Sequence, residues 1–290
     1  MRVSCLKLLI PCVGLLLLGA APAVFAQLPE EPAHASGQGI TGAFEGWFQN
    51  PDGSFSFWFG YNNRNTKEEL EIPIGPNNRI EPGGPDQGQP THFLLQRQMG
   101  VFSIKVPKDF GTKKLTWTLV ANGKTAVIPA SLNPLWEIDP FLEVSAGKTP
   151  PLLWLDPGPS TAKGPNILTK SVTTTVSVPI PLTVWVSDEA KNVPGRPIMP
   201  VPVTIAWSKY RGPGSVTFSK PRPAIEKGPD GGGGTTAPFS GKSTTTATFS
   251  EPGDYVLEVV ANATRGFRCC CCWTDSEIKV SVKADTKAGQ

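Results

Sequence analysis

Four consecutive cysteines, Cys269, Cys270, Cys271 and Cys272, are the residues whose type and spacing most directly suggest chemistry. Thiolates bind soft metals and exchange disulfides, whereas oxidised cysteines only cross-link the chain. Neighbouring Cα atoms are ~3.8 Å apart, which is below the usual disulfide range of ~4.4–6.8 Å. A Cys269–Cys272 bond across a β-turn is therefore the easiest pairing, and it leaves the middle two cysteines as a strained vicinal pair or as free thiols.

The surroundings of the four cysteines favour a structural role. No histidine or methionine lies near them to complete a metal site, and no helix begins there to lower a thiol pKa. We therefore predict disulfides that rigidify a loop, with no catalytic residue, no cofactor and no metal site. A soft-metal cluster or a redox switch is the main alternative. The flanking Phe267 and Trp273 are predicted to form an interaction surface with Trp47 and Trp58.

Residues for hydrolytic chemistry are scarce. The chain has two histidines, and a Ser-His-Asp triad would have to use His92. Glu68, Glu69 and Glu71 could supply the paired carboxylates of a glycosidase. The plainer readings, a histidine packed at the start of a strand and a solvated charged edge, are favoured. A secreted hydrolase is accordingly the second alternative.

The N-terminus has the pattern of a signal peptide. Arg2 and Lys7 precede an apolar run, and the small residues Val24 and Ala26 suit cleavage before Gln27. The run is too short to span a bilayer comfortably. We therefore predict an exported protein, periplasmic or extracellular, with no transmembrane segment after signal removal. In such an oxidising compartment thiols tend to pair.

Removal of the signal peptide also changes the charge. Loss of Arg2 and Lys7 lowers the formal net charge from +3 to +1. No basic stripe remains, so the sequence lacks the electrostatic footprint of a nucleic-acid-binding protein.

The composition and the hydrophobic periodicity predict an all-β protein with two β-sandwich-type domains in tandem. The chain has 31 prolines and 30 glycines, and apolar residues alternate with polar ones along short segments such as Leu182–Val186. The predicted boundaries are a signal peptide at 1–26, a flexible leader at 27–39, an N-terminal β domain at 40–138, a linker at 139–151, a sandwich at 152–284 and a tail at 285–290.

Two long stretches are predicted to be loops. Gly75–Pro90 is rich in Gly, Pro, Asn and Asp, and Ser219–Ser243 contains four consecutive glycines. The four cysteines fall between the last two predicted strands, at one end of the second sandwich.

A hairpin around Asn50–Gly53 has two candidate registers. A plain turn pairs Phe48 with Phe55 and points Trp47 and Trp58 outward, where they could stack on a sugar or a partner. A turn with a glycine bulge pairs residue 50 with residue 54, and this slip of one residue exchanges the two faces. The apolar pattern favours the plain turn. Apart from the register, the two tryptophans could instead cover the core or the interface with the second domain, and this role is favoured over an exposed binding surface.

Five segments of the second domain come in a familiar order: Lys148–Pro151, Val203–Trp207, Gly212–Phe218, Thr246–Phe249 and Pro252–Leu257. Together they resemble the immunoglobulin-like and PKD-like repeats of bacterial exported proteins. The resemblance implies a spacer or interaction module in which Trp207 is a core residue and Tyr255 lies at a strand corner. The first domain, with FEGWFQNPDGSFSFWFGYNNRN, resembles an exported bacterial domain of no assigned function.

These features predict an exported, non-enzymatic binding or scaffolding protein of the cell envelope or extracellular space. Its partner, a protein or a polysaccharide, is not identified by the sequence. The alternatives remain a thiol-based metal or redox protein acting through Cys269–Cys272 and a secreted hydrolase.

Overall fold

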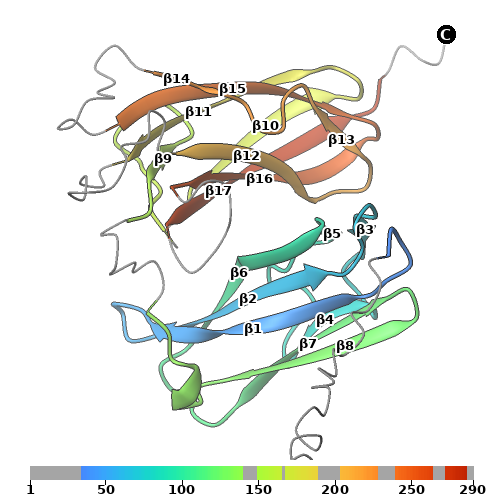
Figure 1. Cartoon of the computed structure of the whole chain (residues 1–290), viewed down its shortest axis with the longest axis vertical. Helices are drawn as coiled ribbons and strands as arrows, with labels where there is room; N and C mark the ends of the chain where they lie inside the picture. Colours follow the sequence, from blue (N-terminus) through green and yellow to red (C-terminus); the bar gives the residue numbers. More distant parts are fainter. Residues whose placement is uncertain are drawn as a thin grey trace, which may run out of the picture. The chain divides into compact units, whose positions relative to one another are not determined.

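The computed structural model describes residues 34–139, 149–164, 167–188, 203–227, 239–263 and 272–285. These residues form seventeen β-strands and one short 3-10 helix, η1 (Pro134–Trp136), which confirms the all-β prediction (Figure 1). Within the same ranges no helix has the length and hydropathy that crossing a membrane requires. The predicted signal peptide, most of the predicted linker, and Phe267 and Cys269 to Cys271 lie outside the described residues.

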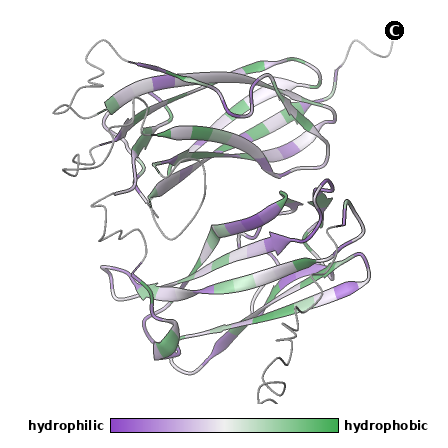
Figure 2. Ribbon diagram, viewed as in Figure 1, coloured by the Kyte–Doolittle hydropathy of each residue, from purple (hydrophilic) through white to green (hydrophobic). Residues whose placement is uncertain are grey.

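The first sandwich consists of two three-stranded antiparallel sheets and a short strand pair. One sheet contains β1 (Ile40–Gln49), β2 (Phe55–Asn63) and β6 (Gln96–Val106); the other contains β4 (Asn78–Glu81), β7 (Lys114–Ala121) and β8 (Lys124–Ser131). The short pair is β3 (Leu70–Glu71) with β5 (His92–Phe93). Hydrophobic and hydrophilic residues alternate along many of the strands, as a half-buried sheet requires (Figure 2).

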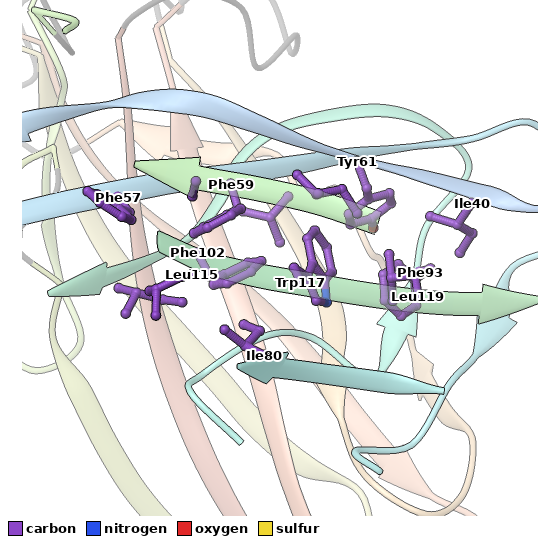
Figure 3. Close-up of a cluster of buried hydrophobic side chains, with 14 of the residues drawn as sticks. Ile40, Phe57, Phe59, Tyr61, Ile80, Phe93, Phe102, Leu115, Trp117 and Leu119 are labelled. Atoms are coloured by element: carbon purple, nitrogen blue, oxygen red, sulfur yellow. The ribbon is translucent and has the colours of Figure 1, made fainter. Parts of the chain in front are cut away.

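Aromatic side chains dominate the core of the first sandwich (Figure 3). Phe59 stacks on Phe102 with ring centroids 5.0 Å apart, and Trp117 contacts both rings edge-on. Trp117 is fully buried, and its indole N–H donates a hydrogen bond of 3.0 Å to the Asn78 side-chain oxygen. The largest apolar residue is thus buried without leaving its polar atom unpaired.

The β1–β2 hairpin adopts the register with the glycine bulge next to its turn. The Asn50 amide donates to the Ser54 carbonyl at 2.8 Å, and Gly53 has a φ of +82°. Trp47 therefore faces Phe57 across the strands, and the plain-turn prediction is wrong here. The pairing shifts again between residues 44 and 46, and beyond this second bulge Phe44 pairs with Phe59.

The register decides the positions of the two tryptophans. Trp47 is 8 % exposed and lies in the core, where its indole N–H donates to the Asn133 carbonyl at 2.8 Å. Trp58 is 7 % exposed and belongs to a separate apolar cluster on the opposite face of the sheet. The outward placement is therefore wrong for Trp47. Trp58 does face away from the first core, but it is buried there and not exposed to solvent. Phe57 is fully buried.

Strand β4 lies inside the stretch Gly75–Pro90 that the sequence predicts to be a loop. Ile80 of β4 is fully buried, and β4 pairs with β7. The buried Asn78 amide donates to the carbonyls of Ile72 and Pro90 at 2.9 and 2.8 Å. The asparagine that suggested a turn is thus a hydrogen-bonding centre inside the sandwich, which is why local composition gave the wrong prediction.

The second sandwich has the sheet arrangement of an immunoglobulin-like domain. One sheet is ordered β9 (Leu152–Trp154), β11 (Ile180–Asp188), β15 (Phe239–Phe249) and β13 (Val216–Phe218), with β14 (Ile225–Lys227) also paired to β15. The other is ordered β10 (Thr169–Thr175), β17 (Trp273–Lys283), β16 (Gly253–Asn262) and β12 (Thr204–Arg211), with β10 parallel to β17. In immunoglobulin nomenclature β11, β15 and β13 correspond to strands B, E and D, and β12, β16 and β17 to strands C, F and G.

Trp207 and Tyr255 occupy the structural positions expected from the resemblance. Trp207 on β12 is 3 % exposed within the core. The Tyr255 hydroxyl, near the start of β16, donates to the Glu251 carbonyl at 2.9 Å and accepts from the Gly214 amide at 3.0 Å. This is the geometry of a tyrosine corner.

Strand β14 lies in the predicted loop Ser219–Ser243, and β15 already begins at Phe239. The loop prediction is therefore wrong at both ends of this stretch, although its four glycines lie outside the described residues. Gly241 explains how β14 can approach β15: a Cβ there would lie 2.4 Å from Ile225 Cγ2 and 2.7 Å from the Glu226 carbonyl oxygen.

The aromatic core of the first sandwich makes a direct prediction. Phe57→Ala removes a fully buried ring that contacts Phe44 and Phe110, so the free energy of unfolding should fall by about 3–5 kcal/mol. Val127→Ala, at a position that is 62 % exposed, should change it by less than about 0.5 kcal/mol. Urea titrations of both variants measure this, and equal effects would contradict the burial of Phe57 in the core.

Candidate functional site

Trp58 and Trp273, two of the residues predicted to form an interaction surface, lie against each other. Their rings stack with centroids 5.4 Å apart and an interplanar angle of 18°. Gly100 of β6 lies beneath them, and a Cβ there would come within 2.6 Å of Trp273 and 2.8 Å of Trp58. The stack joins β2 of the first sandwich to β17 of the second, which matches the alternative that Trp58 covers an interface.

Cys272 is the one member of the cysteine run among the described residues. It is fully buried, and its carbonyl accepts a hydrogen bond of 2.9 Å from the Ala263 amide. It thus continues the pairing of β16 with β17 and places the run at one end of these strands. The pairing of the other three cysteines and the role of Phe267 stay predictions.

Three consecutive residues of β12, Lys209, Tyr210 and Arg211, make the strongest contacts with the first sandwich. The β12–β16 register shifts at this point, and the resulting bulge directs neighbouring side chains to the same side. Tyr210 is 7 % exposed and is part of the first sandwich's core. Its hydroxyl donates to the Gly88 carbonyl at 2.6 Å, and its own carbonyl accepts from the Thr91 amide at 3.1 Å.

Arg211 binds the loop that precedes β5. Its guanidinium makes a bidentate pair with the Asp86 carboxylate at 3.0 and 2.9 Å and donates to the Gln89 carbonyl. The fully buried Gln89 side chain in turn holds the loop, because it accepts from the Gln87 amide and donates to the Pro85 carbonyl. Because Gln89 already holds the loop in place, binding of Arg211 requires the ordering of few additional loop side chains.

His92 and its neighbours form a charged cluster beside these contacts. The His92 Nδ1 and Nε2 atoms lie 2.7 Å from a Glu71 oxygen and 3.0 Å from a Glu69 oxygen. The buried Lys209 ammonium pairs with the same Glu71 carboxylate and donates to the Gly214 carbonyl at 2.8 Å. Of the three glutamates considered for hydrolysis, two are therefore partners of one histidine.

The cluster shifts the pKa values of its members. Burial alone would lower the pKa of His92, but hydrogen bonds and charge attraction from Glu69 and Glu71 outweigh it and raise the pKa. Burial would raise the pKa of Glu71, but His92 and Lys209 outweigh it and lower the pKa. Both ring nitrogens of His92 are engaged, so neither can accept a proton from a serine in this arrangement.

We call the contacts of Trp58, Trp273, Tyr210, Arg211 and the His92 cluster the junction. They join residues of the first sandwich to residues of β12 and β17, and His34 onward forms one compact unit. Lys209-Tyr210-Arg211 was not predicted from the sequence as a functional segment. The sequence did contain a hint of this contact. Buried and outward-facing residues alternate along the first part of β12, and the run Lys209-Tyr210-Arg211 interrupts that alternation at its end.

A groove of about 500 Å³ lies on the second sandwich, over the sheet that contains β9, β11, β15 and β14. Half-buried Trp154 and Trp185 are cross-strand partners in its lining. Lys227, Lys242 and Glu226 supply charged groups, and Ser187 and Ser240 supply hydroxyls. We call this site the outer groove.

The outer groove was also missed from the sequence, although one of its residues could have been found. Leu182, Val184 and Val186 were assigned to the core face and are buried. Period-two alternation therefore places Trp185 on the outer face of the same strand. Trp154 carries no such signal, because its strand is only three residues long.

The His92 cluster predicts a pH dependence of stability. The pKa of His92 is raised in the folded protein. Its contribution to the free energy of unfolding is therefore complete below the unfolded-state pKa of about 6.5. That contribution is lost as the pH rises through the pKa of His92 in the folded protein. Glu71 acts in the opposite sense, because its pKa is lowered in the folded protein. Its contribution to the free energy of unfolding is present above its unfolded-state pKa and is lost as the pH falls through its pKa in the folded protein.

We therefore expect wild type to lose more unfolding free energy than His92→Gln between about pH 5.5 and about pH 8.5. Urea denaturation at both pH values measures the difference. Glu69, Glu71 and Lys209 are the charged groups that contact His92 or its partner. Parallel pH profiles for the two proteins would show that the histidine does not hold its proton through these carboxylates.

No protein-family model and no curated protein matches the chain. Among solved structures, domains 4 and 5 of the S-layer protein SbsC align at 10 % identity over 80 % of this chain and 82 % of that one, with a TM-score of 0.21. A protein of unknown function from Porphyromonas gingivalis W83 aligns at 10 % identity over 84 % and 100 %, with a TM-score of 0.21. Drosophila N-cadherin EC1-3 aligns at 12 % identity over 81 % and 79 %, also with a TM-score of 0.21. Likenesses of this size carry no argument about function, and the PKD-like resemblance stays a prediction.

Proposed function

We propose that the protein is an exported, non-enzymatic binding or scaffolding protein of the cell envelope or extracellular space. The junction is the observation that carries the proposal. Tyr210 is buried in the core of the neighbouring sandwich, and Arg211 forms a bidentate ion pair with its loop. A polypeptide that joins two sandwiches in this way can present their outer faces at a fixed spacing, which is a property that a scaffold requires.

The contacts of the residues considered for hydrolysis support a non-enzymatic role rather than a hydrolase. His92 has a carboxylate on each ring nitrogen, and Glu71 is shared between His92 and the buried Lys209. A general acid–base pair needs a group with an available nitrogen or oxygen facing its substrate. In the described structure these groups stabilise one another instead.

The cysteine-based alternative receives less support from the one described cysteine. Cys272 is fully buried between strand ends. Thiol exchange and metal capture both require access of a partner to the sulfur. A loop cross-linked by disulfides is consistent with this burial and remains our prediction for the run.

Cell fractionation combined with a pelleting assay tests the proposal. We expect the secreted protein to begin at Gln27 and the purified mature protein to pellet saturably with envelopes isolated from the organism that makes it. Val127→Ala is the control, because it alters an exposed side chain away from the junction. We also expect no release of soluble sugar reducing ends or peptides from the envelopes.

Tyr210→Ala should weaken the pelleting, because it removes the side chain that connects the two cores. Circular dichroism should show that both sandwiches stay folded. Retention of the signal peptide, absence of any saturable pelleting, or time-dependent release of envelope fragments would each contradict the proposal.

A further inference from the structure

Strand β10 is an edge strand of the second sandwich and pairs only with β17. Two hydrogen bonds show which of its backbone groups face β17. The Leu168 carbonyl accepts from the Glu277 amide, and the Val176 amide donates to the Lys283 carbonyl, each at 2.9 Å. Both bonds involve even-numbered residues, and backbone groups alternate in direction along a strand. The odd-numbered residues of β10 therefore point their N–H and C=O groups away from the sheet.

Most of these outward-pointing backbone groups have no partner. Thr169, Ser171 and Thr173 are exposed, and their backbone groups hydrogen-bond to no residue that the structure describes. Thr175 differs, because its carbonyl accepts from the Val178 amide at 3.1 Å in the turn that ends the strand. Each of the first three residues supplies one donor and one acceptor. The edge thus presents a continuous row of groups that can bind another strand.

Edge strands usually carry a feature that blocks the addition of another strand, such as a proline, a bulge, an outward charge or a short length. Among the described strands, β8 contains Pro129, and the pairings of β1, β6 and β12 contain bulges. The edge strands β3, β4, β5, β9, β13 and β14 have at most four residues. β10 has seven residues and no proline, and its one charged residue, Lys170, pairs with Asp156. β10 is therefore the edge best suited to strand addition.

Two exposed apolar residues flank this edge. Ile167 precedes β10 and is 48 % exposed, and Val178 follows it and is 50 % exposed. Within the described part of the second sandwich, no other large apolar residue is exposed. The turn Thr175–Val178 holds its first and last Cα atoms within about 7 Å, so Val178 lies beside the end of β10.

We propose that β10 pairs antiparallel with β10 of a second copy of this chain, about a two-fold axis at Ser171. Ser171 then lies opposite Ser171 of the second copy, and Thr169 lies opposite Thr173. In an antiparallel ladder such opposed residues exchange two hydrogen bonds. Every outward donor and acceptor of the three residues is satisfied, as an isologous dimer requires.

The apolar residues and the turn select this register. With the axis at Ser171, Ile167 lies opposite Thr175 of the second copy and hence beside its Val178. The contact occurs twice, once at each end of the paired strands. An axis at Val172 would instead require the Thr175 carbonyl, which the turn already uses.

The contact is small, since it comprises one strand pair and two apolar contacts. Interfaces of this size are typically weak, so we expect a reversible dimer with a dissociation constant between about 1 µM and about 1 mM. The inference is independent of the proposed function, because that function is compatible with a monomer and with a dimer.

Sedimentation velocity of the purified mature protein, at concentrations across this range, tests the proposal. We expect the weight-average mass of wild type to rise from monomer toward dimer. Ser171→Pro should weaken dimerisation roughly tenfold or more, because it removes an outward N–H from each copy. The β10–β17 ladder does not use that N–H, so the sandwich should stay folded. Ser171→Ala is the matched control, because it keeps the N–H and should dimerise like wild type.

A charge exchange tests the register. Ile167→Glu and Val178→Lys should each weaken dimerisation severalfold, and the double variant should recover it, because the two new charges attract each other across the interface. Within one copy the seven residues of β10 separate the two positions by about 20 Å. Recovery therefore requires contact between copies.

Three results would overturn the proposal. They are a wild type that stays monomeric at every concentration, a Ser171→Pro variant that dimerises as strongly as Ser171→Ala, and a double variant no better than either single variant. A monomeric wild type that still pellets with envelopes would leave the proposed function intact.

Discussion

The burial of Tyr210 in the core of the neighbouring sandwich is the interaction on which the rest of the structure depends. A tyrosine ring at the end of β12 can reach that core only because a bulge reorients the strand there. Once the ring is inserted, Lys209 and Arg211 on either side must find partners, since a buried cation without one is costly. Glu71, Asp86 and the Gln89 carbonyl are those partners. The insertion of the Tyr210 ring into the first core therefore requires the ion pairs and hydrogen bonds that Lys209 and Arg211 make.

The two outer faces of the second sandwich differ in what they contact. The sheet with β12, β16 and β17 supplies the junction residues, including Val256, which packs against the first core, and Trp273. The sheet with β9, β11 and β15 carries the outer groove on its far side from the shared core. A sandwich can attach through one sheet and leave the other sheet's outer face accessible, because its two sheets expose opposite faces.

Sequence reasoning succeeded where a pattern is local and failed where a contact joins distant residues. The alternation of Leu182, Val184 and Val186 was sufficient to predict a half-buried strand. Asn78 was misassigned to a loop because its partners, Ile72, Pro90 and Trp117, are revealed only by the fold. Trp47 was placed outward because a second bulge near Gly46, which lets Phe44 and Trp47 both pack on the core, cannot be read from turn chemistry. Trp58 does face away from the first core, but the residue that covers it, Trp273, is distant in the sequence. The junction was missed for the same reason, since Tyr210 and Gly88 are 122 residues apart.

If the junction holds the two sandwiches as one body, residual dipolar couplings of backbone amides will show it. In weakly aligned wild-type protein, we expect the couplings of strands β1–β8 and of strands β9–β17 to fit a single alignment tensor. In a Tyr210→Ala, Arg211→Ala double variant they should require two. A wild-type protein whose sandwiches already need tensors of different magnitude would contradict the account, because the junction contacts would then not persist in solution.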